Sequence, residues 1–232
     1  MNIVIIGTGY VGLVTGVGLA SLGNNINFLD LDENKIQNLS NKKITFYEPG
    51  LEEYFNDDET FSRMFFSSDY ASIEWQNIDI VFVCVQTPNN LETNSVDTNF
   101  LESAIKEINN VNNDDLVITI KSTIPPYEIE KVCEKVGMDS SKLTFNPEFL
   151  REGTAVEDFF KPDRIVLGGT NNEKLNKLKE LYTDFDCEII ITDSISSQLI
   201  KYLANTYLPL RLSFVNEATR LIDYSGGNLD DV

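Results

Sequence analysis

Residues 1–30 read MNIVIIGTGYVGLVTGVGLASLGNNINFLD, and this stretch decides the fold of the chain. It opens on a short, mostly β-branched apolar run, 2–6, which is typical of a strand that is buried on both faces. The glycine-rich turn 7–12 follows directly, and a segment of small residues with helical length, 13–22, comes next. A second apolar run then ends in Asp30. The order strand, turn, helix, strand, acid predicts a βαβ unit at the start of the chain.

The glycines of this turn indicate a binding site for the diphosphate of a dinucleotide. Gly7 permits the tight turn, Gly9 lets backbone N–H groups approach the diphosphate, and Gly12 lets the helix pack closely on the sheet. The helix N-terminus adds unpaired N–H groups and a partial positive charge. The alternative is a glycine turn that joins a strand to a helix for packing alone.

Asp30 indicates which dinucleotide is bound. It lies eighteen residues after Gly12, where an acid accepts hydrogen bonds from the adenosine ribose and repels a 2′-phosphate. Leu31 and Asp32 follow it, so no basic residue comes directly after the acid. The stretch therefore favours NAD over NADP.

The composition excludes several classes of function. The 232 residues carry a net charge of −19, which argues against nucleic acid and anionic membrane surfaces as partners. The chain has no histidine, and its three cysteines have neither paired nor metal-type spacing, so we predict no metal site. It shows no signal peptide and no apolar run near eighteen residues, so we expect a cytoplasmic, reduced protein outside the membrane.

Beyond residue 30, apolar runs of strand length alternate with helical spacing, which predicts an α/β fold with a Rossmann-like, doubly wound, mainly parallel sheet. The expected strands are 64–66, 79–85, 116–121, 143–145, 164–168 and 188–192, and the expected helices are 33–39, 51–55, 100–108, 127–136 and 173–182. From 194 to about 224 one long helix with an apolar stripe follows, with a kink expected at Pro209 and a stop at Gly226-Gly227. We divide the chain into an NAD-binding domain, 1–193, and the long helix, 194–232.

Ligands of open α/β sheets bind at the carboxyl ends of the strands, near the point where the strand order reverses. The loops expected there are 7–12, 86–90, 121–126 and 146–153. Thr87 and Thr123 offer hydroxyl groups that suit a nicotinamide ribose or a bound water, although both also favour turns beside proline.

Two pairs of residues four apart add candidates for chemistry. Glu148 and Glu152 share a face if their segment is helical, as a general base and a ribose or substrate contact, or as a solvated helix start. Lys201 and Asn205 share a face of the long helix, where they would hold an oxyanion and a water. The alternative for this second pair is a surface lysine beside a capping amide.

These motifs resemble those of the UDP-glucose 6-dehydrogenases, within the wider group of UDP- and GDP-sugar dehydrogenases. The similar segments are GTGYVGL (7–13), YEPGL (47–51), KSTIP (121–125), NPEFLREG (146–153), PDR (162–164) and KYLANTY (201–207). They span nearly the whole chain in the family's order. Glu48, Glu148 and the PDR segment are more similar to UDP-glucose than to UDP-N-acetylmannosamine enzymes, and GDP-mannose dehydrogenase is a closer competitor.

The resemblance implies a role for each matching position. The implied NAD contacts are Gly7, Gly9, Tyr10, Val11, Gly12, Asp30, Lys35, Thr87, Pro88, Thr123 and Glu152. Glu148 would be an acid–base residue, Lys201 and Asn205 would stabilise oxyanions and position water, and Thr123 would complete the catalytic set. The implied substrate site is Glu148, Phe149, Leu150, Arg151, Glu152, Lys201 and Asn205. The family oxidises the C6 alcohol of a UDP-sugar to a carboxylate with two NAD in succession, through a cysteine that captures the aldehyde.

The chain departs from the family at that cysteine. The family places it in a Gly-Tyr-Gly-Gly-type segment beyond the long helix, whereas this chain ends at Val232. Cys84, Cys133 and Cys187 lie in other contexts, so the resemblance gives none of them that role. We expect the amino-terminal part of such an enzyme, which binds NAD, dimerises through the long helix and is inactive alone. The alternatives are a GDP-mannose, other sugar-nucleotide or hydroxyacid dehydrogenase, and a stand-alone NAD-binding dimerisation module without chemistry.

Overall fold

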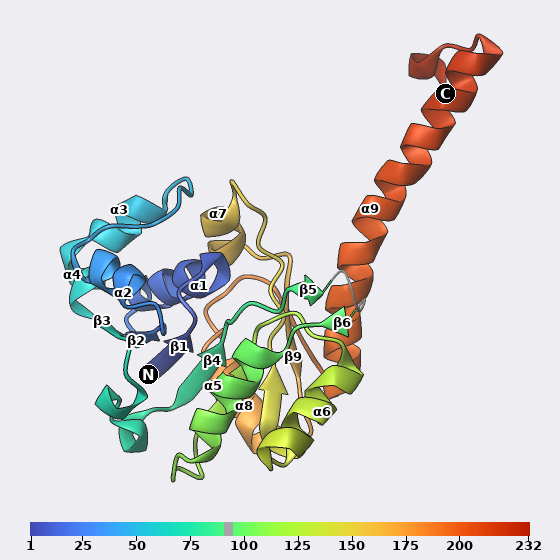
Figure 1. Ribbon diagram of the computed structural model, residues 1–232. Helices are drawn as coiled ribbons and strands as arrows, with labels where there is room; N and C mark the ends of the chain where they lie inside the picture. Colours follow the sequence, from blue (N-terminus) through green and yellow to red (C-terminus); the bar gives the residue numbers. More distant parts are fainter. Residues whose placement is uncertain (91–94) are drawn as a thin grey trace.

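The computed structural model describes residues 1–90 and 95–232, in which an eight-stranded sheet is flanked by helices on both faces (Figure 1). The strands of this sheet are β1 (Asn2–Ile6), β2 (Asn25–Leu29), β3 (Met64–Ser67), β4 (Ile80–Val83), β7 (Val117–Ile120), β8 (Leu143–Phe145), β9 (Arg164–Gly168) and β10 (Glu188–Thr192). The helices are α1 (Tyr10–Ser21), α2 (Glu33–Ser40), α3 (Leu51–Asn56), α4 (Asp58–Ser62), α5 (Asn99–Asn109), α6 (Pro126–Val136), α7 (Ala155–Phe160), α8 (Asn172–Glu180) and α9 (Ser194–Ser225). A small antiparallel hairpin pairs β5 (Asn89–Asn90) with β6 (Ser95–Val96).

The strand order is β10-β9-β8-β7-β4-β1-β2-β3, and all neighbours from β3 to β8 run parallel. The order reverses between β1 and β4, with Ile3 beside both Ile26 of β2 and Ile80 of β4. This reversal is the place where doubly wound sheets bind their ligands. The predicted Rossmann-like, mainly parallel sheet is confirmed.

Both faces of the sheet carry an apolar core, because successive strand residues point to opposite sides. On one face Ile3 and Ile5 of β1 pack in a cluster with residues of α1, α3, α7 and α8, such as Leu13 and Phe159. On the other face the cluster around Val4 includes residues of α5 and α6. Figure 1 shows α1 and α7 on the side opposite α5 and α6. The strands thus hold the loops at their carboxyl ends in fixed positions.

β9 runs antiparallel to β8, with Phe145 beside Gly168 as the one register pair between them. β9 therefore borders the carboxyl end of β8 instead of lying fully beside it. The parallel pairing of β10 with β9 follows the same reversed direction.

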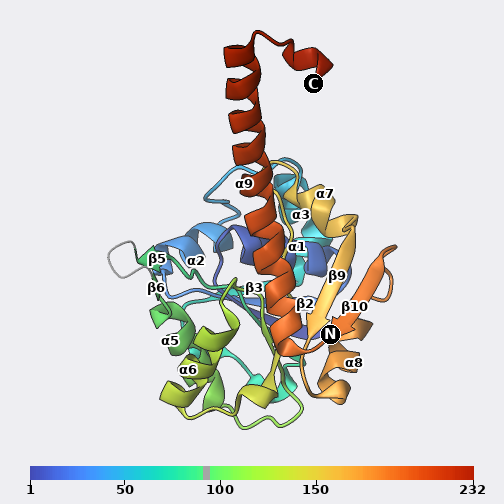
Figure 2. The ribbon, with the colours of Figure 1, turned by 90° about the vertical axis from the view of Figure 1, so that its right-hand side faces the viewer.

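The first turns of α9 pack against β8, β9 and α6, and the rest of the helix projects from the body (Figure 2). Ser197, Gln198 and Lys201 are buried, whereas most of the large apolar residues further along, such as Leu210 and Phe214, are exposed. The helix continues through Pro209 and ends before Gly226, as its glycine stop predicted. Within the described residues, no helix combines the length and apolar character needed to cross a membrane.

The structure corrects several predicted elements. The first helix begins at Tyr10 and not at residue 13, and the strand expected over 79–85 ends at Val83, so Cys84 lies after it. The helices α4 and α7 and the β5–β6 hairpin were not predicted. α4 and α7 are too short for their apolar periodicity to stand out from a loop.

Candidate functional site

The three glycines of the first turn have different surroundings. Gly7 has a φ of +96°, and a side chain there would come within 2.7 Å of the backbone oxygen of Cys84. A side chain on Gly12 would lie 1.9 Å from the carbonyl oxygen of Gly7. By contrast, a Cβ on Gly9 would meet no protein atom within 4 Å. Packing explains two of the glycines, and the open space at Gly9 fits a ligand that approaches the backbone.

The first turn of α1 faces this open space. The N–H of Leu13 donates to the carbonyl of Gly9 at 2.9 Å, which leaves the N–H groups of the preceding turn without a helical partner. No described side chain caps this end, and the first turn contains no acid. Tyr10 and Val11, predicted as NAD contacts, therefore lie where unpaired N–H groups and the helix dipole suit a diphosphate.

Asp30 lies at the end of β2 beside the same turn. Its Oδ2 accepts hydrogen bonds from the N–H and the hydroxyl of Thr8, both at 2.8 Å, and its Oδ1 accepts from the N–H of Asp32 at 3.0 Å. Burial alone would raise the pKa of Asp30, but these hydrogen bonds and Lys35, with Nζ 3.7 Å from Oδ2, together hold it below its ordinary value. An ionised acceptor is thus fixed at the position expected for a ribose contact.

The loops after β4 and β7 are tied together. The hydroxyl of Thr87 donates to the carbonyl of Thr123 at 2.7 Å, and the hydroxyl of Ser122 donates to the carbonyl of Val85 at 2.6 Å. Pro88 is exposed beside them. The structure therefore brings the predicted Thr87 and Thr123 together at the reversal of strand order.

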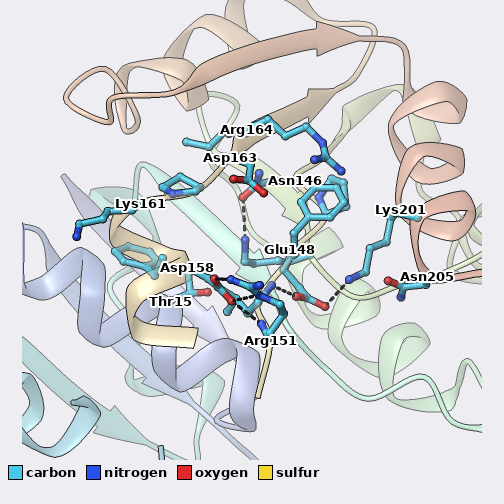
Figure 3. A pocket seen from close by; sticks show the side chains of 18 of the residues that line it. Thr15, Asn146, Glu148, Arg151, Asp158, Lys161, Asp163, Arg164, Lys201 and Asn205 are labelled. Atoms are coloured by element: carbon cyan, nitrogen blue, oxygen red, sulfur yellow. Dashed lines mark hydrogen bonds and ion pairs between the residues drawn. The ribbon is translucent and has the colours of Figure 1, made fainter. Parts of the chain in front are cut away.

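A cavity of about 530 Å³ lies between the segment 146–151, the residues that follow α7, and the part of α9 from 201 to 208 (Figure 3). The Nζ of Lys201 is 2.8 Å from Oε1 of Glu148, and their side chains are 7% and 14% exposed. The other carboxylate oxygen of Glu148 accepts the N–H of Leu150 at 2.7 Å. Asn205 also lines the cavity, one turn beyond Lys201. This arrangement places a buried acid, a buried cation and an amide around one space.

Glu148 and Glu152 would share a face only in a helical segment, and this condition is not met. Residues 146–154 form no helix, and α7 begins only at Ala155. Glu148 points to Lys201, whereas Glu152 is exposed. The alternative of Lys201 as a surface lysine is also wrong, since its side chain is buried.

The remaining predicted substrate residues line the same cavity. The ring of Phe149 lies beneath the guanidinium of Arg164, 4.4 Å from its centre, and Leu150 follows it in the wall. Arg151 forms an ion pair with Asp158, and its Nε donates to Oδ2 at 3.1 Å, while its side chain is 76% exposed. Arg151 thus lies at the mouth of the cavity.

A buried polar group at the floor of the cavity was not predicted from the sequence. The Nζ of Lys121 donates to Oδ1 of Asn146 at 3.0 Å, and the Tyr182 hydroxyl donates to the same oxygen at 2.7 Å. The Nδ2 of Asn146 donates to the carbonyl of Val166. Burial lowers the pKa of Lys121. Lys121 and Asn146 belong to motifs noted above, but no sequence signal linked Tyr182 to them.

The structure does not give any of the cysteines the properties of a nucleophile. Burial raises the pKa of Cys84 to about 12 and that of Cys133, which lies on α6, to about 11. Cys187 precedes β10, and burial raises its pKa too. These thiols remain protonated at neutral pH, so their thiolate populations are small.

The family model described as the UDP-glucose/GDP-mannose dehydrogenase family, NAD binding domain, matches residues 1–186. A UDP-glucose 6-dehydrogenase of Rickettsia felis is 38% identical over 237 residues, which cover 100% of this chain and 52% of that protein. The enzyme YwqF of Bacillus subtilis, named for the same activity, is 36% identical and is covered to 53%. The chain therefore spans about half the length of the curated relatives it matches.

Solved structures show the same fold. A UDP-glucose dehydrogenase from Pyrobaculum islandicum superposes with a TM-score of 0.88 at 32% identity, over 98% of this chain and 54% of the other. A ternary complex of GDP-mannose dehydrogenase from Pseudomonas aeruginosa gives a TM-score of 0.90 at 26% identity, over 100% of this chain and 55% of the other.

Proposed function

The chain belongs to the UDP-glucose/GDP-mannose dehydrogenase family, whose NAD-binding domain it contains, and we propose that it is the NAD-binding part of a UDP-glucose 6-dehydrogenase. The observation that carries the NAD assignment is the open space at Gly9 beside the uncapped start of α1 and the ionised Asp30. The names of the relatives at 36–38% identity support UDP-glucose as the substrate of the whole protein.

In this proposal the residues of the chain divide the work between binding and proton transfer. The N–H groups of Tyr10 and Val11 hold the diphosphate of NAD, and Asp30 accepts hydrogen bonds from the hydroxyls of the adenosine ribose. Bound NAD would accept hydride from the sugar C6. Lys201 stabilises the negative charge that develops on the C6 oxygen. Glu148, whose Oε1 lies 2.8 Å from Nζ of Lys201, takes up the proton that the C6 hydroxyl releases as the hydride leaves. Asn205 positions water beside them.

Titration calorimetry of the chain with NAD and then NADP tests the cofactor assignment. We expect NAD to bind, NADP to bind much more weakly, and Asp30→Asn to weaken NAD binding by about tenfold or more, because a charged acceptor is lost. Asp184→Asn, an exposed aspartate away from the site, is the matched control. A folded chain that does not bind NAD, or an Asp30→Asn variant that binds it unchanged, would overturn the assignment.

The substrate assignment has a separate test. Oxidation of UDP-glucose is compared with that of GDP-mannose, in this chain and in a form extended to the length of its relatives. We expect turnover only in the longer form and with UDP-glucose. Preference for GDP-mannose would overturn the UDP-glucose assignment and identify the protein as a GDP-mannose dehydrogenase.

A second candidate function is a stand-alone NAD-binding module that dimerises through α9. The exposed apolar residues of α9, such as Leu203, Leu210 and Phe214 at 61–72% exposure, support the dimerisation that this alternative requires. It also fits the expected homodimer of the enzyme, so the two candidates differ in chemistry and not in assembly. A dimer that binds NAD, with no turnover in any form of the protein, would favour the module.

A further inference from the structure

Glu48 is a buried acid outside the set of residues assigned above, and its side chain joins two parts of the site. The residue is 4% exposed. Its Oε1 accepts the N–H of Ala155 at 2.8 Å, and its Oε2 accepts the N–H of Gly153 at 2.9 Å. Among the described residues, no lysine or arginine forms an ion pair with it. Hydrogen bonds therefore take the place of a counterion, as a buried carboxylate requires.

Tyr10 links this carboxylate to the glycine turn. Its hydroxyl donates to Oε2 of Glu48 at 2.8 Å and lies 3.1 Å from the carbonyl oxygen of Arg151. Its ring packs on Phe46, with centroids 5.5 Å apart. Burial and the hydrogen bond to Glu48 raise the pKa of Tyr10, so the hydroxyl keeps its proton. The backbone of Tyr10 is at the same time the first residue of α1, directly after Gly9.

We propose that Tyr10 and Glu48 are positioning residues that couple the glycine turn to the segment 151–155, so that occupancy of the turn orders this segment. The inference rests on the NAD binding proposed above. A diphosphate that binds the N–H groups of the first turn of α1 restrains the backbone of Tyr10 and with it the hydroxyl. Glu48 is then held in place, and its two oxygens restrain the N–H groups of Gly153 and Ala155. By linkage, an ordered 151–155 segment strengthens NAD binding in return.

A purely structural role for Glu48 would stabilise the fold without this response to NAD. The two roles can be told apart at the N–H groups of Gly153 and Ala155, which donate to Glu48, because a restrained N–H exchanges its hydrogen more slowly. Direct contact of NAD with Glu152 would also slow exchange in this segment. That direct effect would persist without the Tyr10 hydroxyl, whereas the coupled effect would not.

The test measures hydrogen exchange of the peptide 151–156 in this chain with and without saturating NAD, for the wild type and for Tyr10→Phe. We expect NAD to slow exchange about tenfold or more in the wild type and less than about threefold in Tyr10→Phe. Tyr54→Phe is the matched control, since this tyrosine of α3 packs beside α7 on Phe160. It should respond as the wild type does.

Glu48→Gln gives an independent readout. We expect it to weaken NAD binding about fivefold in the wild type and less than about twofold in a Tyr10→Phe background, because the two groups act as one connection. Glu53→Gln, at an exposed acid of α3, should leave NAD affinity unchanged in both the wild type and the Tyr10→Phe background. Full slowing of exchange in Tyr10→Phe at saturating NAD, or additive losses in the double variant, would overturn the inference. A wild-type chain that does not bind NAD would instead overturn the proposed function on which it rests.

Discussion

At the scale of single residues, the pair Glu148 and Lys201 determines how the cavity holds charge. Both side chains are largely buried, so each would leave an uncompensated charge if the other were removed. We expect Glu148→Gln or Lys201→Met alone to lower the free energy of unfolding by about 2–3 kcal/mol, and the double variant to lose less than the sum, with a coupling of about 2 kcal/mol. Urea denaturation of the wild type, the two single variants and the double variant measures this coupling.

The matched comparison is the pair Glu102 and Lys135. Its two atoms are closer, at 2.6 Å, but the side chains are 23% and 62% exposed, so water screens the interaction. The same cycle should give a coupling below about 1 kcal/mol. Equal couplings in the two pairs would show that burial does not strengthen the Glu148–Lys201 pair.

The limits of sequence reasoning are clearest at this scale. Glu148 and Lys201 were each predicted as functional residues, but they are 53 residues apart, and nothing local to either one showed that they pair. The contact of Glu48 with Ala155 spans 107 residues in the same way. Residue type at a motif position is visible in a sequence, whereas a partner brought near by the sheet is visible only in the fold.

At the scale of elements, α1 separates the two reasons for glycine in the first turn. Gly12→Ala places a methyl group 1.9 Å from the Gly7 carbonyl oxygen, so we expect it to cost about 3 kcal/mol of stability. Gly9→Ala meets no protein atom, and we expect a stability change below about 1 kcal/mol but a loss of NAD affinity of about tenfold or more. Thermal unfolding and NAD titration of both variants measure this. Unchanged NAD affinity in Gly9→Ala would favour a turn made for packing.

Asp79 connects β1 to α8 and gives the fold a dependence on pH. Its Oδ2 accepts the N–H of Asn2 at 2.9 Å, and its Oδ1 is 3.1 Å from Nζ of Lys177. Burial raises the pKa of Asp79, but these partners outweigh it and hold the pKa below its ordinary value. A depressed folded-state pKa stabilises the protein above the unfolded value, near about 4, and that stability is lost as the pH falls through the folded value.

We therefore expect Asp79→Asn to lower the free energy of unfolding by about 1 kcal/mol at pH 7, with the difference shrinking as the pH falls from about 5 to about 3. Denaturant unfolding at several pH values measures it. Asp184→Asn, at an exposed position, should follow the wild type throughout. A cost that grows on acidification would contradict the sign of the shift.

The correct strand predictions and the wrong predictions both have physical reasons. Strands buried on both faces read as continuous apolar runs, as in β1 and β7, and these runs do not depend on distant contacts. The direction of β9 depends on the path of the connection 146–163, which the sequence of the strand does not record. Glu148 and Glu152 have helical spacing but lie in the irregular segment before α7, which begins only at Ala155.

At the scale of the whole molecule, the structure divides into a body that buries its apolar residues and a helix that does not. The body has a core on each face of the sheet. Beyond Lys201, α9 leaves the body with an apolar stripe at helical spacing, formed by Leu203, Tyr207, Leu210, Phe214 and Leu221, all exposed. A contiguous exposed apolar stripe is typical of an interaction surface. A second copy of the chain presents the same stripe, and we propose it as the partner.

The exposed stripe of α9 favours self-association. We expect the chain to be a dimer in sedimentation at micromolar concentration, and the double substitution Leu210→Glu with Phe214→Glu to make it a monomer. Each large apolar side chain buried between the copies would contribute about 1.5–3 kcal/mol, and a charge there would oppose association. Thermal unfolding of the variant monomer should match the wild type at low concentration, since Leu210 and Phe214 are 61% and 72% exposed and bury little apolar surface within one chain. Phe100→Glu, at a 51% exposed position of α5, should remain a dimer. A wild-type monomer would assign the stripe to contacts other than a second copy.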